Sequence, residues 1–413
     1  MYAHPHEIEP LLPTRDVGEL EDLAIEVIRE SATLGASLAA GTRSGVVDLT
    51  RTINSYYSNL IEGHDTHPID VERAFRQDYA KDSKKRALQF ESTAHIAVQR
   101  RIEERLQVEP DLDVCSSEFL TWVHRAFYER MPEEFHWVQH GGERERIVSG
   151  ALRAREVQVG RHVAPTFTSI EAFLRRFDEA YAPSRLRAPT REIAAAASHH
   201  RLGWIHPFLD GNGRVMRLFT HAYLERAGIG GHGLWSVSRG LARRRAAYLQ
   251  ALEEADEPRR GALDGRGNLS DRALHDFCVF FLDTALDQIR YMREQLDLDG
   301  LEERILGFVE LAVARGETRH EAAYLLRDVM LRGEVARGEA ARITGMSERS
   351  ARYLLAELLA QGLLSSSTAK GPLRLGIPPR VVPYYFPRLY PGPIEHDLTT
   401  VRPRALGGDR RRE

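Results

Sequence analysis

Apolar residues recur at helical spacing along most of this chain, and that periodicity restricts the fold more than any other feature. The segments that it predicts to be helical are residues 19–41, 45–63, 68–75, 86–107, 116–130, 168–181, 190–204, 213–227, 238–255, 270–296 and 301–315. Residues 150–165 have a different pattern, because apolar and polar residues alternate near two glycines, as in a short β-hairpin. The sequence therefore predicts a mainly α-helical protein that carries a short hairpin.

The composition narrows the functional class. With 413 residues, of which 42% are hydrophobic and 28% charged, the chain is typical of a globular protein with several domains. Its two cysteines, Cys115 and Cys278, exclude a disulfide framework and a cysteine-based zinc site, and we expect both in the core. We find no apolar run of about 18 residues and no signal-peptide pattern, so we expect a cytoplasmic protein with no membrane partner.

Residues from about 318 onward have the pattern of a separate module. A helix–turn–helix over residues 339–361 is followed by two short extended segments joined by a turn at 370–372, which is the layout of a winged helix. Residues 332–413 contain fourteen Lys and Arg but eight Asp and Glu, a net charge of +6, which leaves −9 for the rest of a chain whose total is −3. This asymmetry favours DNA as a partner, and docking to another protein is the alternative. The expected contact residues are Ser347, Arg349, Ser350 and Arg352.

The segment most informative about function is a glycine-rich loop that leads into the helix predicted at 213–227. A Gly-Asn-Gly run directly before a helix leaves backbone N–H groups unpaired and allows close approach of an anion, so it predicts a phosphate site. Two arginines three residues apart share one face of the first helical turn, where their guanidinium groups can grip terminal phosphates. The residues of this predicted phosphate site are Gly211, Asn212, Gly213, Arg214 and Arg217.

Two further residues of the loop supply reactive chemistry. Asp210 offers a hard oxygen ligand beside the phosphates, as Mg²⁺ requires. His206 is the group in the loop that can accept a proton near neutral pH, which makes it the candidate base. His199 and His200 end the preceding helix, and we interpret them as packing or polar support and not as metal ligands.

Residues 206–217 fit every position of the signature HPFx[DE]GNGRxxR, and on this ground the chain resembles the Fic family of nucleotidyl-transferring enzymes. The resemblance extends over roughly residues 45–260. It implies a mainly α fold, a Fic-type helical bundle with a short β-hairpin flap, followed here by a winged-helix domain. The domains that we expect are an N-terminal helical region (1–107), a catalytic core (108–260), a helical connector (261–330), a winged helix (331–390) and an extended, disordered tail (391–413).

The resemblance implies a reaction in which AMP passes from ATP to a Tyr, Ser or Thr hydroxyl of a target protein, itself included, with release of pyrophosphate. In that reaction Asp210 would hold Mg²⁺, and the glycine-rich run would line the anion hole. Arg214 and Arg217 would grip the β- and γ-phosphates, while His206 would take the proton of the hydroxyl. A kinase-like branch of the family departs from the signature at its second glycine, so the presence of Gly213 here favours AMP as the transferred group.

A second motif lies upstream, in the helix predicted at 45–63. Ser58, Glu62 and Gly63 resemble the inhibitory motif [ST]xxxE[GN] of the family. The resemblance implies that Glu62 pairs with Arg217 and excludes the γ-phosphate from a productive pose, because a carboxylate and a phosphate compete for one guanidinium group. The alternative is that Ser58 and Glu62 are an ordinary exposed pair near the end of a helix.

The resemblance assigns two further elements. The hairpin at 150–165 resembles the flap, which pairs with the target segment by strand addition, and we expect Val157 and Val159 on one face with Gly160 at the tip or exit. Tyr248 lies in a segment similar to the helix that flanks the nucleotide, so we expect it to contact the nucleotide; the alternative is that it is a core residue.

Other activities remain open at this stage. Fic relatives also transfer phosphate, UMP or phosphocholine, and some members with an inhibitory glutamate remove AMP from their target. A de-AMPylase or a transferase of another group is therefore one alternative, and an ATP-sensing DNA-binding regulator is another. A homodimer is also open, since Fic proteins often dimerise.

Overall fold

The computed structural model describes residues 2–64, 68–140 and 142–390 of the chain. The chain divides into two compact units between Leu298 and Asp299. This division falls within the region predicted as a connector, and the residues predicted as an N-terminal region and a core lie together in the first unit. The predicted tail, 391–413, lies outside the described residues.

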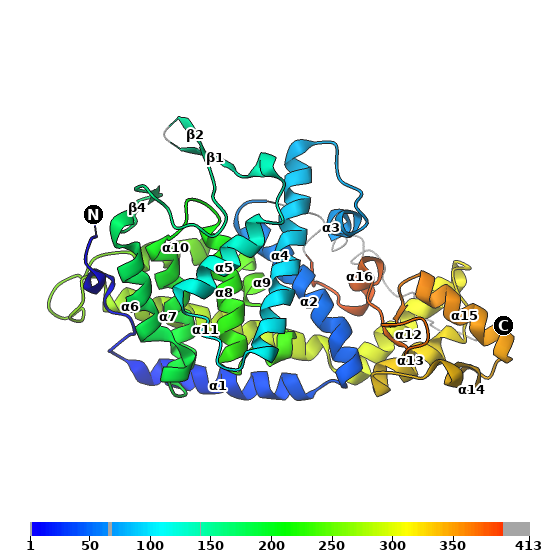
Figure 1. Cartoon of the computed structure of the whole chain (residues 1–413). Helices are drawn as coiled ribbons and strands as arrows, with labels where there is room; N and C mark the ends of the chain where they lie inside the picture. Colours follow the sequence, from blue (N-terminus) through cyan, green and yellow to red (C-terminus); the bar gives the residue numbers. More distant parts are fainter. Residues whose placement is uncertain (1, 65–67, 141, 391–413) are drawn as a thin grey trace, which may run out of the picture. The chain divides into compact units, whose positions relative to one another are not determined.

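The first unit is an assembly of helices (Figure 1). Its helices are α1 (Val17–Ala36), α2 (Ala40–Ile61), α3 (Pro68–Phe75), α4 (Ser83–Val108), α5 (Ser117–Tyr128), α6 (Ile170–Tyr181), α7 (Thr190–Ile205), α8 (Asn212–Arg226), α9 (Val237–Arg243), α10 (Arg245–Ala255) and α11 (Asp271–Gln295). They follow the predicted segments closely, except that the segment predicted at 238–255 is divided into α9 and α10 at Arg244. None of the described helices is long and apolar enough to cross a membrane.

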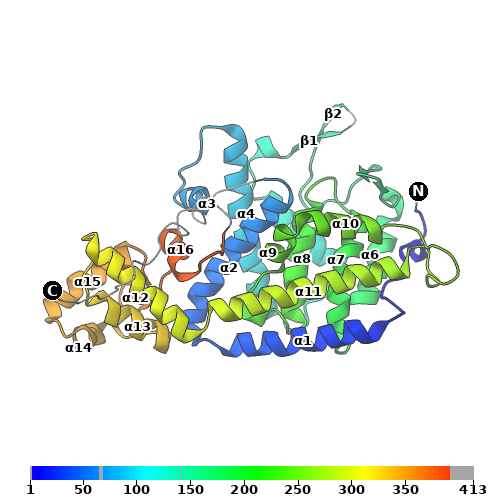
Figure 2. The ribbon, with the colours of Figure 1, turned by 180° about the vertical axis from the view of Figure 1, so that it is seen from behind.

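α8 lies inside this unit, packed against α4, α5 and α7. Every residue of α8 from Val215 to Leu224 is buried, so the helix is covered on all its faces. A helix that is apolar on several faces has to be surrounded by other elements. On the other side of the unit α11 runs beside α1 (Figure 2) and also packs on α7, α9 and α10. Cys115 and Cys278 are both buried free thiols, as expected.

The first unit also carries two antiparallel hairpins. The predicted hairpin is present but short, with β3 (Gln158–Val159) paired to β4 (His162–Val163). A hairpin that the sequence did not predict precedes it, formed by β1 (Trp137–His140) and β2 (Glu143–Arg146), with Trp137 opposite Arg146. β2 consists of charged residues alone, and the two apolar residues of β1, Trp137 and Val138, are adjacent, so neither strand has the apolar alternation that would have predicted it.

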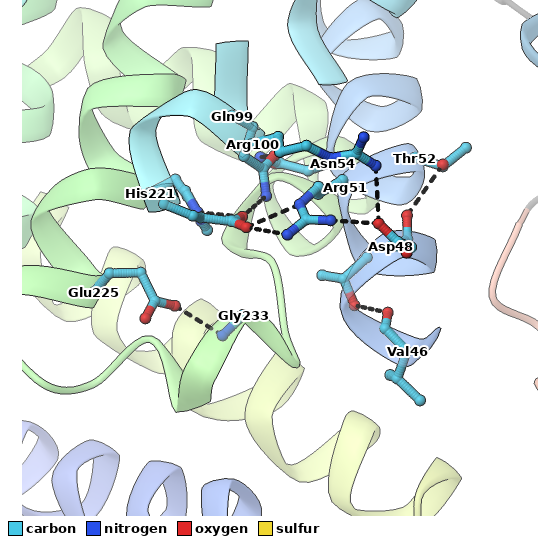
Figure 3. A network of polar contacts seen from close by, with 12 residues as sticks. Val46, Asp48, Arg51, Thr52, Asn54, Gln99, Arg100, His221, Glu225 and Gly233 are labelled. Carbon is cyan, nitrogen blue, oxygen red and sulfur yellow. Dashed lines mark hydrogen bonds and ion pairs between the residues drawn. The ribbon is translucent and has the colours of Figure 1, made fainter. Parts of the chain in front are cut away.

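A chain of polar contacts fixes α2 to α4 and α8 (Figure 3). Arg51 of α2 donates from Nε to Oε2 of Glu103 in α4 at 2.8 Å, and Oε1 of Glu103 lies 3.1 Å from Nε2 of His221 in α8. One turn further along α2, Asn54 donates to Oε1 of Gln99 at 2.7 Å. Burial alone would raise the pKa of Glu103, but His221 and Arg51 override it and lower that pKa to about 2. α2 is thus held beside the helix that follows the glycine-rich loop.

The second unit begins with α12 (Leu298–Ala314) and continues through α13 (Ala322–Arg332), α14 (Ala340–Thr344), α15 (Glu348–Ala360), β5 (Leu364–Ser365), β6 (Arg374–Leu375) and α16 (Val382–Tyr385). α14 and α15 form the expected helix–turn–helix. Gly345 turns the chain at φ 68°, and the hydroxyl of Ser347 caps α15 by accepting from the amide of Ser350 at 3.3 Å. The hairpin β5–β6 follows, with Leu364 opposite Leu375. Identification of these elements as a winged helix stays a prediction.

We expect Glu103→Gln to destabilise the first unit, because it removes the carboxylate that pairs with His221 and leaves Arg51 with only the exposed Asp48 among its described partners. Breaking a buried ion pair by removing one partner costs about 3–5 kcal/mol, so the free energy of unfolding should fall by about that amount in urea denaturation at neutral pH. Glu104→Gln, at the neighbouring exposed position, is the matched control and should change it little.

The pH dependence of this effect follows from the low pKa of Glu103. Its ordinary pKa is 4.5 and its folded pKa is about 2, so its charge contributes stability above about pH 4.5, and that contribution is lost as the pH falls toward 2. The difference in unfolding free energy between the wild type and Glu103→Gln should therefore narrow over this range. A difference that stays constant down to about pH 3 would contradict the role of the charge.

Candidate active site

The glycine-rich loop between α7 and α8 is held in one conformation by its own residues. His206 ends α7 in a left-handed conformation, with φ 49° and ψ 60°, and Gly211 also has a positive φ, 79°. Asn212 closes the loop, because its Oδ1 accepts from the amide of Phe208 at 2.9 Å and its Nδ2 donates to the carbonyl of Phe208 at 2.8 Å. The Asn212 side chain therefore shapes the loop, and its backbone amide belongs to the first turn of α8.

This loop opens onto a cavity of about 460 Å³. The first amides of α8 have no acceptor four residues earlier within the helix, so they and the positive end of the helix dipole favour an anion there. The structure brings together most of the residues predicted for the phosphate site. The predicted residues that line the cavity are His206, Asp210, Gly211, Asn212, Gly213, Arg214 and Glu62.

His206 is uncharged at neutral pH. Burial lowers its pKa to about 4, and the positive charge of Arg153 acts in the same direction. A neutral imidazole can accept a proton, so His206 has the protonation state that a general base needs.

Asp210 is oriented by residues of α5. Tyr128 donates from its hydroxyl to Oδ2 of Asp210 at 2.7 Å. The ring of His124 holds the Asp210 backbone, because Nδ1 accepts from the amide of Gly150 at 2.8 Å and leaves Nε2, at 3.3 Å, to donate to the Asp210 carbonyl. A Cβ at Gly211 would lie 3.0 Å from the Tyr128 ring, so glycine permits this close approach.

The donor set at Asp210 fits a magnesium ion that arrives with a nucleotide. Across residues 2–64, 68–140 and 142–390, no three His, Cys, Asp or Glu side chains are grouped so that they could hold a metal ion. Mg²⁺ in nucleotide sites is usually held by one or two carboxylates together with phosphate oxygens and water. One oriented carboxylate beside an anion site is therefore sufficient.

Arg217 is buried, and two residues of the α2 end satisfy it. Its side chain is 2% exposed. Ser58 accepts from its Nε at 2.8 Å, and Glu62 accepts from its Nη2 at 2.5 Å. Burial alone would raise the pKa of Glu62, but Arg217 overrides it and holds that pKa below its usual value. The ion pair implied by the resemblance is thus present in the structure.

Two glycines make this ion pair possible. A Cβ at Gly213 would lie 2.3 Å from Oε1 of Glu62 and 3.1 Å from Nη1 of Arg217, so any larger residue would displace the carboxylate. Gly63 follows Glu62 with φ 86°, in the left-handed region that favours glycine, and it ends the helical segment there. Arg245 of α10 fixes the same end of α2 by donating to the carbonyl of Ile61 at 2.7 Å.

Arg214 is paired as well, with a residue that the sequence did not identify. Its Nη2 lies 2.8 Å from Oε1 of Glu91 in α4, and the two side chains are 11% and 13% exposed. Oε2 of Glu91 lies 3.6 Å from Nδ1 of His64, and this carboxylate raises the pKa of His64. Each arginine of the phosphate site therefore faces a carboxylate.

Tyr248 does not line the cavity, and its contact with a nucleotide stays a prediction. It is 1% exposed, and its hydroxyl lies 2.8 Å from Nε2 of His199, whose Nδ1 lies 2.6 Å from Oγ1 of Thr220. Tyr248 therefore supports the site from inside the protein. His199 and His200 have the expected supporting role, since His200 lies 3.0 Å from a carboxylate oxygen of Asp256.

The hairpin β3–β4 is the segment predicted as the flap, and Gly160 lies at its tip with φ 59°. Val157 and Val159 differ in burial, with exposures of 8% and 48%, and the expectation that they share one face stays a prediction. The physical reason for the difference in burial is that Val157 precedes the paired residues and sits at the base of the hairpin, where its carbonyl accepts from the amide of Ala164 at 3.3 Å. Val159 is the valine available to a target segment.

Sequence reasoning missed several residues that support the site. Tyr128, His124, Glu91 and Arg153 are distant in the chain from the loop that they contact. One signal was available, since His124 and Tyr128 are four residues apart and hence on one face of a predicted helix. Glu91 and Arg153 are charged residues in segments rich in charge, and nothing local separates them from surface residues.

Comparisons with known proteins agree with this geometry. The model of the Fic/DOC family matches residues 114–224. Over 88 residues the chain is 36% identical to the protein adenylyltransferase Fic of Drosophila willistoni and 38% identical to that of Drosophila yakuba. The match covers 21% of this chain and 18% of each relative, so the chain spans less than a fifth of the length of these relatives.

A crystal structure of a Fic family protein from Desulfovibrio desulfuricans G20 is similar in fold. The TM-score is 0.51 at 16% sequence identity, and the match covers 88% of this chain and 98% of that one. At this identity the likeness concerns the fold alone. The loop, its cavity and the match over residues 114–224 show that this part of the chain is a Fic/DOC domain.

Proposed function

We propose that this protein is an Mg²⁺-dependent protein adenylyltransferase that moves AMP from ATP to a hydroxyl side chain of a target protein, and that Glu62 inhibits it. The observation that carries the proposal is the convergence of neutral His206, Asp210 and the N-terminus of α8 on one cavity. The curated relatives, which bear the name protein adenylyltransferase, support the same reaction.

In the proposed reaction, the oxygens of the β- and γ-phosphates of ATP accept hydrogen bonds from the first amides of α8 and from Arg214 and Arg217. His206 removes the proton of the target hydroxyl as its oxygen attacks the α-phosphorus in line. The bond from the α-phosphorus to the bridging oxygen then breaks, and pyrophosphate leaves. Asp210 would hold Mg²⁺, which neutralises phosphate charge when bound. The protein contributes mainly positioning and charge stabilisation.

Inhibition follows from competition for the same cations. Glu62 occupies Nη2 of Arg217 and lies against Gly213, in the space that a γ-phosphate would need. A phosphate has to displace this carboxylate before it can bind Arg217. Arg214 is also paired, with Glu91. A triphosphate therefore has to displace Glu91 from Arg214 and Glu62 from Arg217 before it can bind both arginines.

The first test uses purified wild type, Glu62→Gly and Glu62→Gly/His206→Ala with Mg²⁺ and ATP labelled at the α- or the γ-phosphate. We expect covalent label on protein from α-labelled ATP alone. Glu62→Gly should raise the rate by about tenfold or more, which corresponds to about 1.4 kcal/mol of the activation barrier. The double variant should lose about 10²- to 10⁴-fold, the usual contribution of a general base, while it still binds ATP.

The other outcomes of this experiment separate the alternatives. Label from γ-labelled ATP would indicate a kinase. Release of AMP from a pre-labelled target, without transfer by any variant, would indicate a de-AMPylase. Absence of label on the protein itself and on lysate proteins would refute the transferase proposal, and a rate in Glu62→Gly no higher than in the wild type would remove the inhibitory role of Glu62.

A second test concerns Glu91. Because it competes for Arg214, we expect Glu91→Gln in the Glu62→Gly/His206→Ala background to tighten ATP binding by up to about tenfold, or about 1.4 kcal/mol. Isothermal titration with Mg²⁺ and ATP measures this. Glu134→Gln is the matched control, since Glu134 lines the same cavity but pairs with Arg86. Weaker binding in Glu91→Gln would mean that Glu91 orients Arg214 for phosphate and does not compete with it.

We also propose DNA as a partner of the second unit. The observation that favours it is an exposed face near the start of α15, formed by Arg349, Arg352 and Tyr353. The Arg349 guanidinium lies over the Tyr353 ring at 5.9 Å, and Arg352 pairs with the exposed Glu348 at 3.3 Å. A cationic and aromatic face at the start of a recognition helix fits phosphate and base contacts.

Duplex binding by the full chain tests this partner. We expect the affinity to fall with added salt, and Arg349→Glu/Arg352→Glu to weaken binding about tenfold or more, since each phosphate contact adds to the salt-dependent term. Arg315→Glu, at an exposed position in the same unit, is the control. Failure to bind any duplex at low salt would exclude the proposal.

A further inference from the structure

Arg153 is a fully buried cation between the flap and the glycine-rich loop. Its side chain is 0% exposed, and the nearest carboxylate, that of Glu156, is 3.7 Å away. The guanidinium group is satisfied mainly by backbone carbonyls, which is an unusual environment for a charge that cannot be lost. Burial lowers the pKa of Arg153 accordingly.

Two hydrogen bonds of Arg153 hold the start of the glycine-rich loop. Nε donates to the carbonyl of His206 at 2.8 Å, and the backbone amide of Arg153 donates to the carbonyl of Pro207 at 2.9 Å. His206 has φ 49°, a conformation that costs energy for a residue with a side chain and persists only when the surroundings impose it. Arg153 is therefore in place to impose the backbone conformation that aims the His206 ring.

The remaining bonds hold the base of the flap. Nη1 donates to the carbonyl of Arg155 at 2.7 Å, and Nη2 donates to the carbonyl of Pro165. These two carbonyls lie on either side of the hairpin β3–β4. The guanidinium group of Arg153 thus joins both arms of the flap to His206. A shift of the flap would therefore change the hydrogen bonds that hold His206.

We infer that Arg153 is a positioning residue for the proposed transfer, which aligns His206 through its carbonyl and links that alignment to the flap where the target segment docks. This inference rests on the proposed function for its kinetic part. Its structural part, the control of His206 by Arg153, can be measured without any turnover.

The test compares Arg153→Met and Arg153→Lys in the Glu62→Gly background, with Arg155→Met as the control. The side chain of Arg155 is 35% exposed and pairs with Glu145, so its loss leaves the backbone carbonyl in place. We expect both Arg153 variants to lower kcat by about 10²-fold, as a small misalignment of a catalytic group does. The affinity for ATP should stay unchanged, because Arg153 contacts none of the predicted phosphate-binding groups.

The protonation of His206 provides the second readout, by NMR titration of the full chain. The charged and titratable groups that act on His206 are Arg153, His162 and Asp210. Arg153→Met removes a positive charge, so the pKa of His206 should rise from about 4 toward its ordinary 6.5. The acidic limb of the pH–rate profile should then move to higher pH. Arg153→Lys keeps the charge and should lower kcat without this shift.

The experiment distinguishes failure of this inference from failure of the proposed function. If Glu62→Gly transfers no label, the proposed function fails, and the titration of His206 in the two variants still decides whether Arg153 controls it. If Glu62→Gly transfers label while folded Arg153→Lys retains its kcat, the inference is wrong. If Arg153→Met does not fold, Arg153→Lys carries the kinetic test, and an unchanged kcat in it overturns the inference.

Discussion

The burial of Arg217 is the constraint on which the arrangement around the loop depends. A guanidinium group keeps its charge in a protein, so at 2% exposure it needs acceptors whether or not a ligand is present. Phosphate oxygens are the acceptors that the proposed reaction supplies. Without them, Ser58 and Glu62 take that place. The contact that we propose to be inhibitory is therefore also the resting partner of a buried cation, which gives the fold a physical reason to keep it.

The interior position of α8 explains how distant segments reach one loop. α4 contributes Glu91 to Arg214, and α5 contributes Tyr128 to Asp210. α2 is located by the Arg51–Glu103–His221 contacts, and His221 is one helical turn after Arg217 on α8 itself. Glu62 lies at the end of α2 and contacts α8, and α8 therefore also positions the end of α2 that carries Glu62.

Local chemistry could be predicted from the sequence, and long-range contacts could not. The loop from His206 to Arg217 was predictable because its chemistry lies within one short segment, and the helices because their apolar periodicity is strong. The Glu62–Arg217 pair was predictable only through a known family pattern. Glu91 and Arg153 carry no local signal, since their roles arise from partners far along the chain. The contact of Tyr248 with a nucleotide was expected from the resemblance alone, and the sequence did not reveal that its hydroxyl meets His199.

The two ends of the loop are controlled separately. At its start, the pKa of His206 is set by burial, by Arg153, by a hydrogen bond to the Gly203 backbone and by His162 and Asp210, and Glu62 is not among these influences. At its end, Glu62 acts on Arg217 and against Gly213. His206 is therefore neutral, as the proposed reaction needs, while Glu62 occupies Arg217. In the proposed mechanism, phosphates therefore replace the two carboxylates on α8, Glu62 at Arg217 and Glu91 at Arg214, and His206 needs no change of protonation.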